Sequence, residues 1–172
     1  MDAKQLRALQ TPLKEKYRST PDAALITLRA MGSVDNSAIT CKVETGRALA
    51  VAGLHPATGG TGAELCSGDM LLEALVACAG VTLKAVATAL EIPLDKGEVF
   101  AEGDLDFRGT LGVDKEANVG FQAIRLRFEI VSAAPQPQLD QLMKLTERYC
   151  VVFQSLKGSA ALTASLHNAP PT

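Results

Sequence analysis

Residues 69–81 have the sequence DMLLEALVACAGV, an apolar run with helical spacing that places Cys78 on its apolar face. A second helix-like stretch, residues 145–153, has the sequence LTERYCVVF and carries Cys150 on its own apolar face. The two stretches predict two buried helices at the core of the fold. If their cysteines meet in space, they can form a redox pair that needs no cofactor.

The helical period also predicts what surrounds each thiol, because residues that share a face recur at fixed intervals along a helix. The expected face of Cys78 comprises Leu71, Ala74, Leu75, Val81, Thr82, Ala85 and Ala89. The expected face of Cys150 comprises Leu139, Met143, Thr146 and Phe153. Free cysteine is also commonly buried for packing alone, so core packing is the alternative interpretation of both thiols.

The length and the net charge of the chain limit the functions that a pair of redox-active thiols can have here. The 172 residues are about the length of one domain, which we place at residues 23–168, after a helical extension (1–22) and before a short tail (169–172). Seventeen Lys and Arg residues against nineteen Asp and Glu residues give a net charge of −2, which does not favour nucleic-acid binding. An aromatic content of 4% offers few stacking platforms.

The N-terminal residues predict a cytoplasmic protein. Asp2, Lys4 and Arg7 place charges within residues 1–7, where a secretory signal would carry its apolar run. The longest apolar stretch, residues 74–83, is shorter than the roughly 20 residues of a membrane span, so we expect a buried helix and no membrane. Cytosolic cysteines are reduced at rest, which favours a transient disulfide over a permanent one.

Alternating apolar and polar residues predict strands on both sides of the first cysteine helix, and the resulting fold class is α+β. We expect an amphipathic N-terminal helix that is bent or restarted near Pro12, a turn at residues 32–36 and a second cysteine helix at 138–157. The expected strands are 24–31, 37–44, 47–54, 99–107, 124–130 and 161–166. Cys41, on the apolar side of the second strand, is interpreted as a small core residue.

A glycine-rich loop at residues 53–68 leads into the first cysteine helix. It lacks the features of a phosphate-binding loop, and its length is typical of a lid or a pocket wall. Its His55 is a possible base or an exposed side chain, and its Cys66 is a second possible resolving thiol or an inert one. No cysteine or histidine pair has metal-ligand spacing, so we expect no metal and no cofactor.

Three segments carry a family resemblance: LLEALVAC at 71–78, AEGDLD at 101–106 and ERYCVV at 147–152. With them the chain resembles the OsmC/Ohr superfamily over residues 24–166. The resemblance implies an OsmC-like fold with antiparallel sheets and two central cysteine-bearing helices, in an intertwined homodimer. It implies Cys78 as the peroxidatic cysteine and Cys150 as the resolving cysteine of a thiol-dependent peroxidase, an oxidoreductase that serves in oxidative-stress defence.

The implied substrate is an organic hydroperoxide, and an external thiol is the implied reductant. The thiolate needs an activating group, because burial disfavours its charge. The best-characterised branch uses an arginine in the first strand turn and a glutamate before the cysteine, whereas this chain has GSVDN at 32–36 and Gly68 at the glutamate position. The possible activating or pocket residues are Arg29, Arg47, Asp69, Glu73, His55 and Cys66.

A different function class stays open. A catalytically altered or inactive OsmC-like dimer would bind a small apolar ligand in an interfacial pocket, with the cysteines only lining it. The residue pair Val151-Val152 after Cys150, in place of the family's frequent Pro-aromatic-Ser, is a further departure that suggests a divergent branch.

Overall fold

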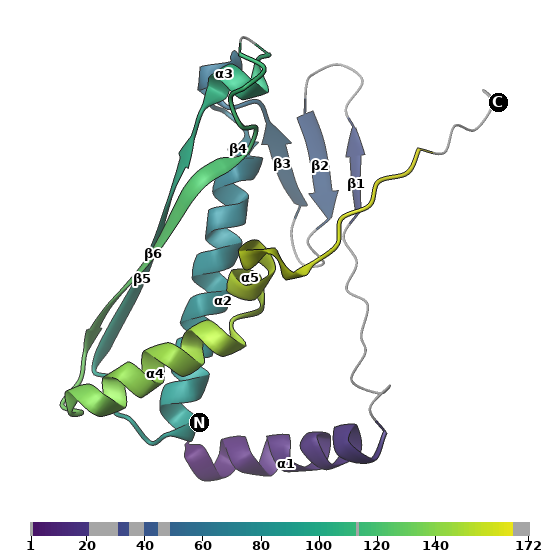
Figure 1. Ribbon diagram of the computed structural model, residues 1–172. Helices are drawn as coiled ribbons and strands as arrows, with labels where there is room; N and C mark the ends of the chain where they lie inside the picture. Colours follow the sequence, from purple (N-terminus) through teal and green to yellow (C-terminus); the bar gives the residue numbers. More distant parts are fainter. Residues whose placement is uncertain (1, 21–30, 35–39, 45–48, 113, 167–172) are drawn as a thin grey trace.

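The computed structural model describes residues 2–20, 31–34, 40–44, 49–112 and 114–166. Arg29 and Arg47 lie outside the described residues, as does most of the strand predicted at 24–31. A central helix, α2 (Ser67–Ala89), runs the length of the molecule, and the other elements lie around it (Figure 1). The α+β class predicted from the sequence is confirmed.

The buried side of α2 is a stripe of residues four apart. Leu75, Ala79, Leu83 and Ala87 are each no more than 3% exposed, as one face of a helix requires. The predicted face was partly wrong: Val81 is 73% exposed. The helical period identifies which residues share a face. In a helix with apolar residues on several sides, it does not identify which face is buried.

The long hairpin beside α2 consists of β5 (Lys96–Leu105) and β6 (Phe121–Val131), which pair antiparallel. Alternate residues of both strands are half-buried, and several of them pack against the cores along α2. The opposite face is charged, with Arg125 paired to Asp104 and Glu102. The alternation predicted these strands, although the first ends at Leu105 and not at residue 107.

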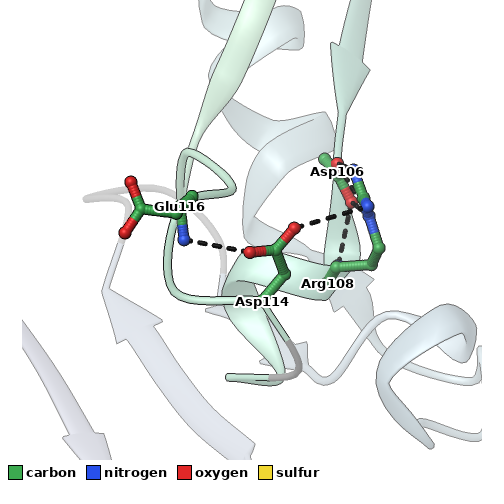
Figure 2. Close-up of polar contacts among 4 residues, drawn as sticks. All are labelled: Asp106, Arg108, Asp114 and Glu116. Carbon is green, nitrogen blue, oxygen red and sulfur yellow. Dashed lines mark hydrogen bonds and ion pairs between the residues drawn. The ribbon is translucent and has the colours of Figure 1, made fainter.

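Asp106 ends that strand by capping the short helix α3 (Phe107–Thr110) through a hydrogen bond from the Arg108 N–H. Figure 2 shows the Arg108 guanidinium between Asp106 and Asp114, with Asp114 also accepting from the N–H of Glu116. These contacts hold the turn that connects β5 to β6.

The second cysteine helix is interrupted. It comprises α4 (Gln136–Tyr149), α5 (Val151–Gln154) and a single π-helical turn, η3 (Ser155–Ser159). Figure 1 shows α4 crossing α2 near one end, with α5 folded back toward the middle of α2. The prediction of one continuous helix over 138–157 was therefore wrong at Cys150.

A second sheet follows the N-terminal helix α1 (Ala3–Ser19), which keeps Pro12 within it. The strands β1 (Met31–Val34), β2 (Thr40–Glu44) and β3 (Leu49–Gly53) form the predicted antiparallel meander. A short strand, β4 (Leu65–Cys66), adds to β3 in parallel. Residues 32–34, predicted as a turn, belong to β1 because they pair with β2.

Two further predictions need correction. Residues 161–166 form no strand; Leu162 and Leu166 are more than 90% exposed, and a strand requires a neighbour to pair with. The helix α2 is longer than the apolar stretch 74–83, and its 23 residues, with a mean hydropathy of 1.8 over an 18-residue window, are enough to cross a membrane by length and composition alone. Core helices meet the same criterion, and α2 contacts β5, α4 and α5.

Candidate functional site

Cys78 lies near the middle of α2, half-buried, at the edge of the buried stripe. It packs against a cluster formed by Leu75, Ala79 and Cys150. Cys150 is 1% exposed. The structure therefore brings together the two cysteines that the sequence singled out, and both remain free thiols.

Cys150 occupies the break between α4 and α5 instead of a helix interior. Its backbone is extended (φ −71°, ψ 107°), its N–H donates to the carbonyl of Thr146, and its carbonyl accepts from the N–H of Gln154. One residue thus ends one helix and begins the next. The break leaves the first N–H groups of α5 without carbonyl partners in their own helix.

Val152 and Phe153 at the start of α5 pack against the cluster that contains Cys150. The N–H groups of Val151 and Val152 lower the pKa of Cys78, and those of Phe153 and Val152 act to lower the pKa of Cys150. The main chain at the break therefore favours negative charge on both sulfurs.

The pKa of Cys78 is lowered below that of an ordinary thiol. Burial raises this pKa, but the hydrogen bonds outweigh burial: first from the Val152 N–H, then from the Cys150 thiol and the Val151 N–H. The hydroxyl of Thr82 adds a smaller contribution, and it also donates to the Cys78 carbonyl at 2.8 Å. Because a hydroxyl has one proton, we regard that backbone bond as its main interaction.

The pKa of Cys150 moves in the opposite direction. Burial raises it, and the neighbouring Cys78 raises it further, because the Cys150 thiol donates to the Cys78 sulfur and would be repelled as a second anion. The pair therefore ionises at Cys78 first. This asymmetry matches the roles that the resemblance implies for an attacking and a resolving thiol.

A pocket of about 330 Å³ adjoins the cysteine cluster. Leu75 of α2 and Phe153 of α5 belong both to its lining and to the packing around Cys150. The remaining lining residues are Phe121, Gln122, Ala123, Ile124, Leu126, Leu156 and Lys157. Its walls are mainly apolar, so it suits a small apolar molecule.

Asp69 and Glu73 lie away from the cysteine pair. Both are exposed on the first turns of α2, where they line a separate pocket of about 470 Å³ with Leu72, Val76, Ala77 and Ala101. Neither contributes to the pKa shift of Cys78.

His55 and Cys66 also lie elsewhere. The His55 ring stacks on Phe107 at 4.9 Å and accepts a hydrogen bond from the Ala57 N–H, so it fixes the glycine-rich loop against α3. Cys66 stands just before α2, and twelve residues at about 1.5 Å each place it roughly 18 Å along the axis from Cys78. That separation exceeds disulfide reach and disfavours Cys66 as a direct resolving thiol.

Sequence reasoning missed Val151 and Val152. It sought a side-chain cation, whereas within the described part of the chain the pKa of Cys78 is lowered by backbone N–H groups and neutral side chains. The signal in the sequence was the pair of β-branched residues directly after a buried cysteine, which weakens a continuous helix. The contact between α5 and α2 that brings these residues to Cys78 is tertiary.

A family profile and similar solved structures indicate the same fold for this chain. Residues 60–165 match the sequence profile of the family described as OsmC-like protein. An OsmC-like protein from Mycoplasma pneumoniae is similar in structure at a TM-score of 0.64 and 17% identity, over 78% of this chain and 89% of that one. No curated protein matches the sequence.

Two other similar structures are named organic hydroperoxide resistance proteins. The one from Legionella pneumophila has a TM-score of 0.60 and 18% identity, over 78% of this chain and 92% of that chain. The one from Elizabethkingia anophelis has a TM-score of 0.62 and 14% identity, over 79% and 91%. At such identities the likeness concerns the fold.

Proposed function

The chain belongs to the family of OsmC-like proteins, and from that premise we propose that it is a thiol-dependent peroxidase that reduces organic hydroperoxides through Cys78 and Cys150. One observation carries the proposal: Cys78 packs against Cys150, and the backbone of Val151 and Val152 helps to lower the pKa of Cys78. The names of the similar hydroperoxide resistance proteins give independent support.

The proposed reaction begins at the thiolate of Cys78. The sulfur attacks the distal oxygen of the hydroperoxide, the O–O bond breaks, and the departing alkoxide takes a proton to leave as an alcohol. Cys78 is now a sulfenic acid. The Cys150 thiol attacks this sulfur, water leaves, and a disulfide joins the two residues.

The cycle closes when an external dithiol reduces the disulfide. The lower pKa of Cys78 serves both halves of this cycle, because it provides the attacking thiolate and also makes Cys78 the better leaving group when a reductant attacks Cys150. No cofactor takes part in these steps, and we place the reaction in the cytoplasm.

The apolar pocket would receive the organic part of the peroxide. Its wall residues Leu75 and Phe153 pack around Cys150, so an apolar group held there would lie near the reacting sulfurs. The wall would also keep water away from the sulfenic acid before the resolving step.

We further propose that the working unit is a homodimer. Among the described residues eight apolar side chains are buried, a small core for the chain, while Val81, Tyr149 and Val151 beside the cysteines in sequence are 73%, 58% and 68% exposed. Covering these side chains with a second copy would remove apolar area from water at about 25 cal/mol per Å².

Steady-state consumption of cumene hydroperoxide with dithiothreitol tests the proposal on the full chain. We expect turnover for the native protein and for Cys66→Ser, the matched control. Cys78→Ser should reduce the rate by on the order of 10³-fold or more. Cys150→Ser should leave a sulfenic acid that dimedone traps. Absence of turnover in the native protein, with Cys78 alkylated at the pH of an ordinary thiol, would sink the proposal.

The second candidate function is binding without catalysis, and the apolar pocket is the observation that favours it. In that case a small apolar ligand would bind the native protein and Cys78→Ser with equal affinity, and no peroxide would be consumed. Calorimetric titration of both proteins separates the two functions.

A further inference from the structure

The apolar pocket beside the cysteine cluster contains one charged side chain. Among the described residues that line it, only Lys157 carries a charge, Gln122 is the one other polar side chain, and the rest are apolar. Lys157 belongs to η3 and Gln122 to β6, so two separate elements bring polar groups to the pocket. Both residues are exposed, so these groups lie where the pocket meets solvent.

One segment joins the thiol end of the pocket to its charged end. Phe153, Leu156 and Lys157 are spaced i, i+3 and i+4, so they share a face of the turns formed by α5 and η3. Phe153 packs against the cluster that contains Cys150. Lys157 comes one turn later, about 6 Å further along the axis at the rise of a helix. A ligand that spans these two residues has one end near the thiols and the other end at an ammonium group.

Lys157 is available to such a ligand. On the charged face of the β5–β6 hairpin the cations pair with neighbouring carboxylates, as Arg125 does with Asp104 and Lys96 with Glu98. No carboxylate of the described residues lies within ion-pair distance of the Lys157 ammonium. A lysine in a last helical turn also stabilises the helix end, so the argument depends on its place in the lining of an apolar pocket.

We propose that the pocket selects small apolar molecules that carry one carboxylate, and that Lys157 is the residue that determines this specificity. The inference rests on the proposed function and deepens it, because it names the substrate class of the same site: organic hydroperoxides that are also acids. The apolar part lies against Leu75 and Phe153, with the hydroperoxide toward the cysteine cluster. The carboxylate accepts hydrogen bonds from the Lys157 ammonium and the Gln122 amide.

The single cation limits the ligand to one negative charge. An ionised group that leaves water for an apolar pocket needs a compensating partner. Lys157 balances one charge, and the Gln122 amide adds a donor but no charge. A phosphate monoester carries close to two negative charges at neutral pH and would be compensated only in part. A carboxylate therefore fits this pocket better than a phosphate does.

The volume of the pocket limits the size of the ligand. The pocket measures about 330 Å³, near the lower end of the roughly 300–1,000 Å³ that is typical of small-molecule sites. Phe121 and Phe153 are both in its lining, and aromatic side chains pack favourably against a ring. The ligand that fits best is therefore an aromatic or short branched acid, whereas a long acyl chain would extend beyond the lining.

Binding of unreactive analogues tests this selectivity without any peroxide. The probes are 4-isopropylbenzoate and 4-isopropylbenzamide, which have nearly the same shape and differ in charge. NMR titration of the reduced full chain measures both dissociation constants and should show shift changes at Phe153 and Ile124. We expect the native protein to prefer the carboxylate about three- to fivefold, as an exposed ion pair allows. Added salt should reduce this preference.

Three variants assign the preference to one side chain. Lys157→Met removes the charge and keeps an unbranched chain, so it should bind the two probes equally. Lys157→Glu should prefer the neutral amide. Lys144→Met is the matched control, because Lys144 is an exposed lysine of α4 outside the pocket lining, and its loss should leave the preference unchanged. Equal loss of the preference in Lys157→Met and Lys144→Met would show an effect of net charge and overturn the role of Lys157.

The substrate class is tested by kcat/KM for cumene hydroperoxide and for its 4-carboxylate derivative. We expect the ratio of the two values to favour the acid in the native protein and to fall in Lys157→Met. Equal values in the native protein would overturn the substrate class. Equal binding of the two probes, or binding of neither, would overturn the selectivity even in an active peroxidase. A preference that depends on Lys157 in a protein that consumes no peroxide would uphold the acid-selective pocket and reject the proposed reaction.

Discussion

Cys78 packs against Cys150, and the interaction between the two thiols moves their pKa values in opposite directions, lowering that of Cys78 and raising that of Cys150. It stabilises negative charge on Cys78 and disfavours a second negative charge on Cys150. The two residues are therefore unequal before any substrate arrives: burial is the largest cause of the raised pKa of Cys150, whereas at Cys78 the hydrogen bonds outweigh burial.

The first prediction concerns this contact. Cys150→Ala removes the donor, so the pKa of Cys78 should rise, and alkylation of Cys78 by iodoacetamide should shift to higher pH. Cys150→Ser retains a donor and should give a smaller shift. The rate of alkylation at Cys78, followed by peptide mass spectrometry across pH, provides the measurement. An unchanged profile in Cys150→Ala would contradict the contact.

A second prediction isolates the backbone donor. Val151→Pro removes the N–H that donates to Cys78, and the replacement fits, because position 151 is the first of α5 and Cys150 already has an extended backbone. The pKa of Cys78 should rise because a contribution that lowers it is lost. The fold should persist by circular dichroism. Val151→Ala keeps the N–H and should leave the alkylation profile of Cys78 unchanged.

The sign of the linkage follows from the lowered pKa of Cys78. Native protein holds this thiolate more favourably than unfolded protein does, so its contribution to stability is present above the unfolded pKa and lost as pH falls through the folded pKa. Urea unfolding of the native protein and Cys78→Ser should therefore diverge as pH rises through this window. Parallel pH dependences would show that Cys78 has no lowered pKa.

The packing of α4 on α2 gives a stability prediction. Leu142 is 0% exposed and belongs to the core cluster with Leu83 and Ala87, so Leu142→Ala should cost about 2–5 kcal/mol of unfolding free energy. Leu162 is 95% exposed, and Leu162→Ala should change stability by less than about 0.5 kcal/mol. Urea titration of both variants measures the difference. Equal effects would mean that α4 does not pack as described.

The proposed dimer can be tested at a single side chain. Val81 and Val119 are both 73% exposed, but Val81 lies one turn beyond Cys78 whereas Val119 lies in the turn before β6. We expect Val81→Asp to shift the mass measured by light scattering from dimer to monomer, and Val119→Asp to leave it unchanged. A native mass equal to that of one chain would refute the dimer itself.

The sequence correctly predicted the helices and strands that are specified by a repeating pattern of apolar residues. The alternation in β5 and β6 and the apolar run of α2 are visible in the sequence, because a sheet face and a helix stripe each repeat at a fixed period. The break at Cys150 is different. It lies where Cys150 packs against Cys78, which is on a helix 72 residues earlier in the chain, and no window around Cys150 contains that information.

Val81 and residues 161–166 are cases in which a local pattern predicted a structure that the rest of the fold does not support. Val81 is as apolar as its buried neighbours, and residues 161–166 have the composition of a strand. Which apolar side of a helix is covered, and whether a strand finds a neighbour, are decided by the rest of the fold. The sequence predicted two cysteines on apolar helix faces, but it did not predict that Cys78 and Cys150 would meet. Two cysteines on apolar faces need not belong to the same core.

The main-chain donors at the break have a consequence for how this chain can vary. Every amino acid except proline presents the same N–H group, so the side chains at 151 and 152 can be exchanged widely while the groups that assist Cys78 are retained. A catalytic arginine is lost by a single codon change, whereas a peptide N–H is lost only with the local conformation. Reactivity of this kind would be inherited with the fold and would leave little trace in a comparison of side chains.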